Sequence, residues 1–485
     1  MATVITPQNR QRLKADGMNA DTHLGKTKAE ASLAEIFHSV GAALPGGSSI
    51  ARWRASAFAD FCASGLPHRR IESWHYTDLR ALMREALPLA TAPGAAALEA
   101  IRKRLEALSS PRIVLVDGYF VPALSTGLPE DVSVRSLSSV LGDGEPGILA
   151  LLGLQDIPAR DPVLSLNAAL MQDGAVIEVA PRAAIARPLH LIEVTALPHP
   201  HARFSRSALI VGEGASLSLA QSHLYIGNEN SIPASQANDC LIISLGEGAS
   251  LSQTVAADGD FGHSLSIESV IVRAGARTKY ESFALVSGYG LLRRQLFLRF
   301  EAPGSEAVLS GVSLLRGREH ADTSLWVEHA APGCVSRETF KYILDGESTG
   351  VFQGRIHVAP GAQHTDAKML SKAILLSDMA TMNSKPELEI FADDVACGHG
   401  ATCGGLDADQ LFYLQSRGLP HAEAEALLLE AFAGELIDGF KNEEQVRGLR
   451  RAVGAWLCAR QGSEAAHGSS SLRGTAQGAN SRSSR

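Results

Sequence analysis

The sequence predicts a mainly β fold, a right-handed parallel β-helix (β-solenoid) flanked by N-terminal and C-terminal helical domains. Three observations lead to this prediction. A glycine-centred turn recurs at a nearly constant step, apolar and polar residues alternate between the turns, and both flanks of the chain carry helical periodicity instead. A chain of 485 residues is long enough for a large core and for several domains.

The recurring turn is clearest in two copies, VGEGASLSLA at 211–220 and LGEGASLSQT at 245–254. Looser copies precede and follow them at steps of 27 to 34 residues. The glycine slot of successive copies holds Arg182, Gly214, Gly248, Gly275, Gly304, Gly333 and Gly361. Between the turns the apolar residues alternate, as in Leu296, Leu298 and Phe300, which is typical of half-buried strands. Strands and a turn at this step describe one coil of a β-solenoid, and the alternative is a β-sandwich with recurring hairpins.

The N-terminal flank carries helical patterns. Residues 28–65 are expected to be helical and to end at Gly65 and Pro67. The Ala-rich stretch 81–107 is also expected to be helical, with interruptions at two prolines. Residues 111–121 are predicted to form a hairpin that turns at Asp117-Gly118.

Three helices are expected after the solenoid. The first is capped by Asp407 and ends at Gly418, the second begins at Pro420, and the third covers about residues 443–460. The second carries an apolar stripe made of Leu428, Phe432, Leu436 and Phe440. The predicted organisation is a disordered N-terminus at 1–27, a helical domain at 28–160, the β-helix at 161–403, a helical domain at 404–461 and a disordered tail at 462–485.

Composition excludes several classes of function. The formal charge is −8 and no basic run occurs, which argues against nucleic-acid binding. No apolar stretch approaches eighteen residues and no secretory h-region occurs, which argues against a membrane span or a signal peptide. Six cysteines in a chain of this length fit reduced thiols better than a disulfide framework. We therefore expect a cytoplasmic protein, with an organellar stroma as the minor alternative.

Sulfur and nitrogen donors gather in one stretch, ADDVACGHGATCGG at 392–405. Cys397 and His399 are two residues apart, so in a continuous strand both side chains project to one face. Thiolate and imidazole are ligands of Zn²⁺, Fe²⁺ and iron–sulfur clusters. Cys403 has the same parity, but the glycines of this stretch argue against a straight strand up to it.

The donor set of this stretch is incomplete. A closed structural site needs four ligands, and the spare donors nearby are Asp393, Asp394 and, farther off, His364. Two interpretations remain open: a buried cysteine with a hydrogen-bonded histidine in the last coil, or a partial site that another chain completes. The sequence contains no P-loop and no G-x-S-x-G elbow, and GEGAS is a duplicated turn.

Three segments resemble the SufB/SufD family of iron–sulfur cluster assembly proteins. NSKPELEIFADDVACGHGAT at 383–402 and LDADQLFYLQSRG at 406–418 are similar to its C-terminal signature, and RRIESWHYTDL at 69–79 is similar to its N-terminal signature on the SufD side. The resemblance implies a non-catalytic subunit that pairs with a SufB-like partner, binds a SufC-like ATPase and binds no nucleotide itself. It also implies a transient iron–sulfur cluster or iron at the interface with SufB, and a reduced flavin (FAD) at the level of the complex.

The resemblance also assigns site residues. His399 and Cys397 correspond to the family's donors at the interface, whereas no role transfers to Cys403. Phe412, Tyr413 and Arg417 are candidates either for contact with the ATPase or for fixing the helices on the last coil. Without SufB, the chain would pair with a second copy of itself as a homodimer.

Two other functions remain as alternatives. A SufB-like cluster scaffold predicts a richer cysteine set in the solenoid, where only Cys240 and Cys334 occur before the motif. A β-helix enzyme acting on polysaccharide predicts a cleft of acidic or basic residues on one solenoid face.

Overall fold

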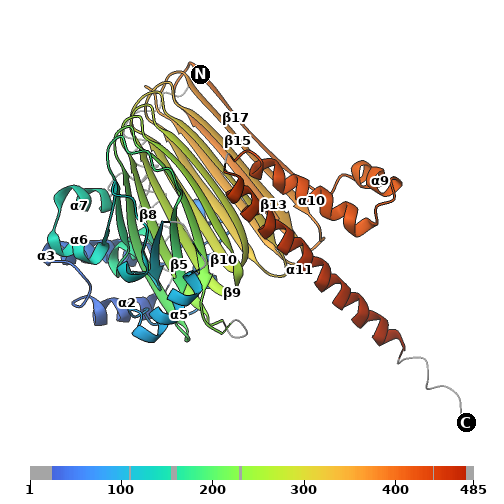
Figure 1. Ribbon diagram of the computed structural model, residues 1–485, viewed down its shortest axis with the longest axis horizontal. Coiled ribbons are helices and arrows are strands. Elements are labelled where there is room, and N and C mark those ends of the chain that lie inside the picture. Colours follow the sequence, from blue (N-terminus) through green and yellow to red (C-terminus); the bar gives the residue numbers. More distant parts are fainter. Residues whose placement is uncertain are drawn as a thin grey trace, which may run out of the picture.

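The fold is a stack of parallel strand coils with helices on its outer surfaces. The computed structural model describes residues 25–106, 108, 111–153, 161–228, 232–440 and 442–476. Figure 1 shows the strands in chain order from one end of the stack to the other, with the N-terminal helices at one end and β17 at the other. No helix in the described ranges is both long enough and apolar enough to cross a bilayer.

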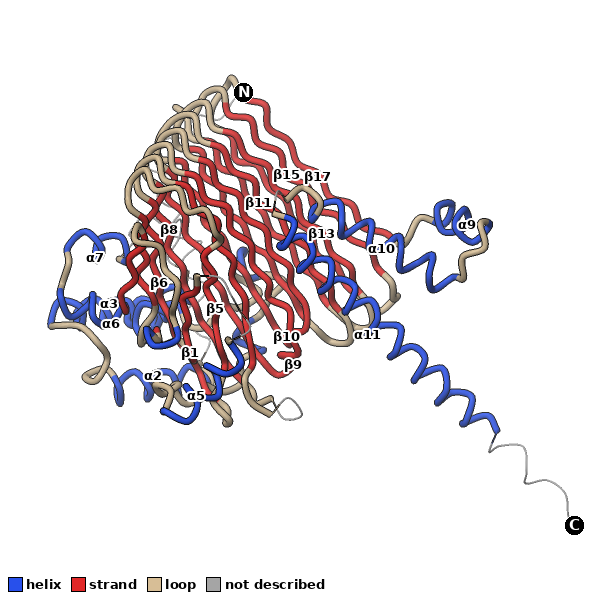
Figure 2. The backbone as a smooth tube through the Cα atoms, in the orientation of Figure 1, coloured by secondary structure: helices blue, strands red, loops and turns tan. Residues whose placement is uncertain are grey.

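Each coil contributes one strand to each of two facing sheets, which we call the front sheet and the back sheet (Figure 2). The front sheet contains β1 (Arg112–Val116), β5 (Leu189–Thr195), β7 (Ser216–Tyr225), the first halves of β9 (Ser250–Ala274) and β10 (Lys279–Phe300), β11 (Glu306–Leu315), β13 (Val335–Leu344), β15 (Thr365–Leu375) and β17 (Val395–Gly404). The back sheet contains β4 (Ala175–Val179), β6 (His201–Val211), β8 (Ser235–Leu245), the second halves of β9 and β10, β12 (His320–His329), β14 (Thr349–Val358) and β16 (Thr381–Ile390). All these pairings are parallel, which confirms the β-helix and excludes the hairpin-built sandwich.

The turn slot of the repeat has the left-handed backbone that its glycines predict. Positive φ values of 63° to 75° occur at Arg182, Gly214, Gly248, Gly304 and Gly333. In two copies the left-handed residue lies a few positions after the predicted glycine. It is Arg277 instead of Gly275 in one copy, and His364 instead of Gly361 in the other. A small local penalty at a non-glycine residue is tolerated because the coils above and below hold the turn.

The main hydrophobic core lies between the two sheets. Alternate residues of each strand point inward, so that one face of every strand is apolar, as the alternation predicted. Leu219, Leu251, Leu309, Tyr342 and Ile356 are typical members and are at most 1% exposed.

The N-terminal region is less helical than predicted. Its helices are α2 (Lys28–Val40), α3 (Ser48–Ser64), η1 (Glu72–Trp74), α4 (Leu79–Leu82), α5 (Ala95–Leu105), η2 (Pro122–Leu124), α6 (Leu137–Asp143), α7 (Pro146–Leu152) and α8 (Pro162–Leu170). Most of the stretch 81–94 is irregular because prolines lack the N–H that a helix needs.

Strands also occupy the region predicted as a purely helical domain. β1 joins the front sheet, β2 (Tyr119–Phe120) forms the predicted hairpin with it, and β3 (Val132–Ser136) pairs with β4. Asp117 and Gly118 both have positive φ at the hairpin turn, as predicted. The sheet therefore begins near residue 112 rather than 161, because the apolar run RIVLV is buried on both sides.

The N-terminal signature segment 69–79 lies on the outer face of the back sheet. The buried ring of Trp74 lies under the guanidinium of Arg293, 3.8 Å from the ring centroid. Arg293 pairs with the buried Asp322, which also accepts a 2.5 Å hydrogen bond from the Thr77 hydroxyl. Glu72 reaches the last strand of the back sheet, where its carboxylate lies 2.7 Å from Lys385 Nζ. The segment thus connects the N-terminal region to β10, β12 and β16.

The C-terminal helices are α9 (Ala408–Ser416), α10 (His421–Ile437) and α11 (Glu443–Ala476). α10 and α11 pack on the outer face of the front sheet, against β10, β11 and β13 (Figure 1). The buried stripe of α10 is centred on Leu429, Ala433 and Ile437, one position from the predicted stripe, and Phe432, Leu436 and Phe440 of the predicted stripe are partly buried beside it.

Both predicted disordered ends need correction within the described residues. Thr27 is not disordered, because its side chain caps α2. Helix α11 continues to Ala476, past the predicted boundary at 461, since each residue added to an existing helix gains a hydrogen bond at low entropic cost. Residues 1–24 and 477–485 lie outside the described residues.

Candidate functional site

The cysteine–histidine stretch forms β17, the last strand of the front sheet. β17 pairs residue by residue with β15, and Cys397, His399 and Cys403 lie opposite Ala367, Met369 and Ala373. These three partners face the core, so the three donor residues share the inward face of the last coil. The shared face of Cys397 and His399 was predicted. The expected break before Cys403 is wrong, since pairing with β15 keeps this glycine-rich strand extended up to Gly404.

The outer edge of β17 is open. Among the described residues, β15 is the strand that pairs with it, and no further coil covers its other side. His399 and Cys403 are consequently exposed and Cys397 is half-buried, although all three occupy the inward face. Ile390 and Phe391, at the end of β16, are 40% and 60% exposed beside this edge. The last coil therefore exposes metal-donor side chains and also apolar side chains to solvent.

The electrostatic surroundings of β17 oppose thiolate formation in the isolated chain. Burial raises the pKa of the Cys397 thiol, and the negative charges of Asp366 and Glu338 raise it further. Burial also raises the pKa of Cys403. A metal ion would reverse this effect, since a bound cation favours the deprotonated thiol.

The spare donors do not complete the site within one copy. Asp394 Oδ2 pairs with His364 Nδ1 at 2.8 Å, in exposed turns at the margin of the last coils. Asp393 is exposed next to it. Across the described part of the chain, no three His, Cys, Asp or Glu side chains are close enough together to hold a metal ion. The arrangement is that of a partial donor set on an open edge.

Sequence reasoning missed one acidic residue near this edge, Glu338 on β13. Its side chain faces inward in the same ladder as Met369 and His399, and it is completely buried. An acidic residue at an inward position of a strand pattern is the signal that could have identified it.

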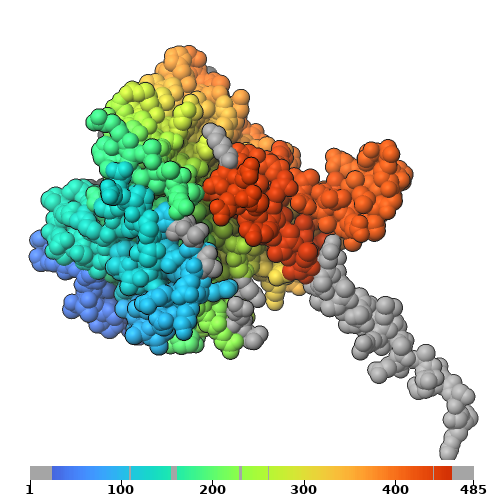
Figure 3. All heavy atoms as spheres, viewed as in Figure 1, coloured from blue at the N-terminus to red at the C-terminus, as the bar shows by residue number. Residues whose placement is uncertain are grey.

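Helix α9 presents the other predicted site residues. Phe412 and Tyr413 are 72% and 56% exposed, and the guanidinium of Arg417 lies 5.2 Å from the Tyr413 ring centroid. No residue of α9 is buried, so these side chains do not fix the helices on the last coil. Figure 3 shows this segment protruding from the body of the molecule. Only three residues lie between the end of β17 at Gly404 and the start of α9 at Ala408.

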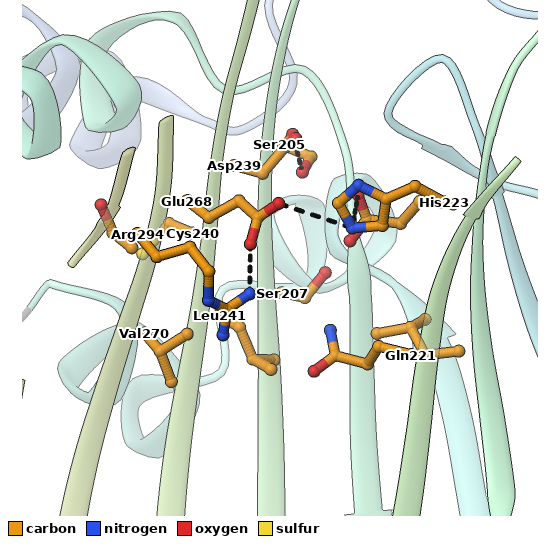
Figure 4. A pocket seen from close by; sticks show the side chains of 13 residues that line it. Ser205, Ser207, Gln221, His223, Asp239, Cys240, Leu241, Glu268, Val270 and Arg294 are labelled. Atoms are coloured by element: carbon orange, nitrogen blue, oxygen red, sulfur yellow. Dashed lines mark hydrogen bonds and ion pairs between the residues drawn. The ribbon is translucent and has the colours of Figure 1, made fainter. Parts of the chain in front are cut away.

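A second group of charged side chains lies between the sheets near the N-terminal end of the solenoid (Figure 4). His223 Nε2 is 3.7 Å from Glu193 Oε2 and 3.6 Å from Glu268 Oε1, and Glu268 also pairs with Arg294. The cavity that they line has a volume of about 30 Å³, enough for one or two water molecules. This volume is far below that of a sugar-binding cleft, and the charges pair with one another. We interpret the group as an internal polar network.

A groove of about 670 Å³ lies between α2 and the irregular segment 88–92 of the N-terminal region. The described residues that line it are mostly apolar, and Asp173 is the one charged residue among them. A flavin dinucleotide carries a diphosphate that needs cationic or N–H donors. The groove does not fit this group, so we derive no flavin-dependent step.

Comparisons with known proteins agree with this architecture. Residues 194–432 match the family model "SUF system FeS cluster assembly, SufBD core domain", and residues 27–191 match "SufBD protein N-terminal region". A Synechocystis protein described as an iron–sulfur cluster assembly SufBD family protein is 31% identical over 77% of this chain and 83% of its own length.

Two further relatives cover most of the chain. The iron–sulfur cluster assembly protein SufD of Escherichia coli is 29% identical over 80% of this chain and 88% of its own length. The chloroplastic protein ABCI7 of Arabidopsis thaliana is 26% identical over 90% of this chain and 94% of its own length. Together with the β-helix and its open edge, these matches show that the chain belongs to the SufBD family of iron–sulfur cluster assembly proteins.

Proposed function

We propose that this chain is a SufD-like, non-catalytic assembly subunit that pairs with a SufB-like scaffold along β17 and binds a SufC-like ATPase through α9. The observation that carries the proposal is the open strand edge, where Cys397 and His399 share one face and the described residues supply no further ligands. In this proposal the partner supplies the missing donors for iron or a nascent iron–sulfur cluster, which is the cargo of the assembly. We expect this assembly in the cytoplasm.

The edge of β17 is suited to strand addition. Its free N–H and C=O groups can pair with a strand of a second subunit, and that subunit would also cover Ile390 and Phe391. Gly398 and Gly404 have open space where a side chain would otherwise project, which allows a close approach of the partner backbone. In the absence of SufB, the same surface would pair with a second copy of this chain.

Helix α9 is suited to transmit motion from the ATPase to this edge. Its Phe412 and Tyr413 side chains form an exposed apolar surface, with the Arg417 guanidinium beside the Tyr413 ring. The short connection to β17 means that a displacement of α9 acts directly on the strand that carries His399. Nucleotide-driven movement of a SufC-like ATPase would therefore open or close the interface with the SufB-like subunit.

The chemistry assigned to this chain is ligand donation. Neutral imidazole of His399 and thiolate of Cys397 are suitable donors to Fe²⁺ or to a cluster. The scaffold alternative is weaker, because Cys240 and Cys334 are both buried and do not extend the exposed donor set.

The test is reconstitution of the complex with His399→Ala. We expect a folded variant that still binds its ATPase partner but forms cluster in much lower yield, since one donor is lost. His364→Ala is the matched control, because His364 is an exposed histidine of the neighbouring turn whose Nδ1 pairs with Asp394. Wild-type cluster yield with His399→Ala would contradict the proposed role of this residue. Purification from the native cell should recover a SufB-like and a SufC-like protein, and their absence would contradict the proposed pairing.

A further inference from the structure

Glu338 is an unusual residue for the inside of a β-solenoid. Its side chain lies on the inward face of β13, next to the side chains of Ser336 and Phe340 on the same face, and is 0% exposed. Among the residues that the structure describes, neither carboxyl oxygen has a hydrogen-bond partner that satisfies normal geometry. Burial raises the pKa of this carboxyl to about 8, although the nearby Ser336 hydroxyl and the charge of Arg337 oppose that rise. The carboxyl is therefore kept mostly neutral at physiological pH.

A buried carboxyl without partners destabilises the fold, because it loses its hydration and gains no hydrogen bond in return. An apolar residue would suit this position better, since Leu309 and Met369 occupy the neighbouring rungs of the same ladder. An unsatisfied buried polar group of this kind calls for an explanation in terms of an ion or a function.

The position of Glu338 relative to the open edge supplies such an explanation. In the ladder, Glu338 lies opposite Met369, and Met369 lies opposite His399. Two strand spacings place the backbones of Glu338 and His399 about 10 Å apart. When its carboxyl is ionised, Glu338 also raises the pKa of the Cys397 thiol. Met369 separates Glu338 from His399 in the ladder, and its sulfur lies against Gly354 of the back sheet.

We propose that Glu338 is the buried anionic partner of a divalent cation, Fe²⁺, that binds at Cys397 and His399. This inference rests on the proposed function of that edge. Without a cation, the Glu338 carboxylate and the Cys397 thiolate disfavour one another across a medium of low dielectric. A divalent cation between the two groups removes this repulsion, because both negative charges then attract the cation. The Glu338 proton leaves to solvent as the cation binds. The flexible Met369 side chain can yield as the cation enters.

The experiment measures Co²⁺ binding, as a spectroscopic probe for Fe²⁺, by the full chain and by its complex with the co-purified partners. Glu338→Gln removes the charge and keeps the shape of the side chain. We expect the dissociation constant for Co²⁺ to rise about tenfold or more, as it does when other residues that support metal ligands are replaced. The matched control is Glu328→Gln, which removes a carboxylate of β12 that pairs with Arg299 outside the core.

Two further readouts separate a role in cation binding from a purely structural one. Calorimetry in buffers of different ionisation enthalpy counts the protons released on binding, and Glu338→Gln should release about one fewer. Glu338→Met should melt at a higher temperature than the wild-type protein while binding Co²⁺ more weakly, because it replaces an unsatisfied acid by an apolar side chain.

The outcomes distinguish this inference from the proposed function. If His399→Ala and Cys397→Ser weaken Co²⁺ binding but Glu338→Gln leaves affinity and proton release unchanged, the inference about Glu338 is overturned and the proposed site stands. If none of the three variants changes Co²⁺ binding, the edge does not bind divalent cations and both fail.

Discussion

Replacing Arg293 by Met should detach the N-terminal signature segment from the solenoid. Arg293 and Asp322 form an ion pair whose side chains are 1% and 0% exposed. The Arg293 guanidinium also covers Trp74 and donates a 2.8 Å hydrogen bond to the Ser73 carbonyl. A methionine keeps much of the apolar stem but leaves the Asp322 carboxylate buried beside the Thr77 hydroxyl without its cation.

The expected loss in free energy of unfolding follows from these contacts. Removing one partner of a buried pair destabilises a protein by about 3–5 kcal/mol, because the remaining charge is uncompensated. The cation–π contact contributes roughly 0.5–2 kcal/mol and overlaps with that figure. We therefore expect a loss of about 4 kcal/mol. The matched control, Arg318→Met, breaks a 3.4 Å pair with Glu347 whose side chains are 88% and 57% exposed, and it should have little effect.

Denaturant unfolding measures the loss, and hydrogen exchange locates it. Amides of residues 69–79 should exchange faster in Arg293→Met, whereas those of the C-terminal helices should not. The double variant Arg293→Met/Asp322→Leu should recover much of the stability, since no unpaired charge remains. A loss below about 1 kcal/mol, or a double variant less stable than the single one, would refute the reasoning.

Two further predictions concern pH and the ATPase. Metal binding at β17 should weaken as pH falls, because protons compete with the metal ion for the Cys397 thiolate. Since burial places the pKa of Cys397 above the usual range of a thiol, affinity should still rise between about pH 7 and about pH 9. Calorimetric titration with Co²⁺ at each pH measures this dependence, and an unchanged dependence on pH in Cys397→Ser would contradict it. Phe412→Ser should abolish co-purification of the ATPase partner. It should change the free energy of unfolding by less than about 0.5 kcal/mol, because the side chain is 72% exposed. Retention of the ATPase would contradict the assignment of α9.

Much of the fold follows from local patterns in the sequence. The recurring turns predicted the coils, because a left-handed residue occurs at each passage from the back sheet to the front sheet between β4 and β15. Alternation predicted the inward faces, and Asp407 correctly predicted the start of α9 through its side-chain hydrogen bonds to the backbone N–H groups of the first turn. These features depend on neighbouring residues alone, which is why the sequence was sufficient for them.

Other features required the tertiary structure. The sequence suggested that Cys397 and His399 share a face, but only the stack shows that this face is left uncovered by a further coil. Glu338 gives no local signal of its proximity to them, because it lies about sixty positions earlier in the chain and two strands away. Trp74, Arg293 and Asp322 likewise meet only through packing between distant segments. The sequence by itself determined the coils and the donor types, whereas the register between coils decided which charges surround the donors, since register depends on contacts that join residues far apart in the chain.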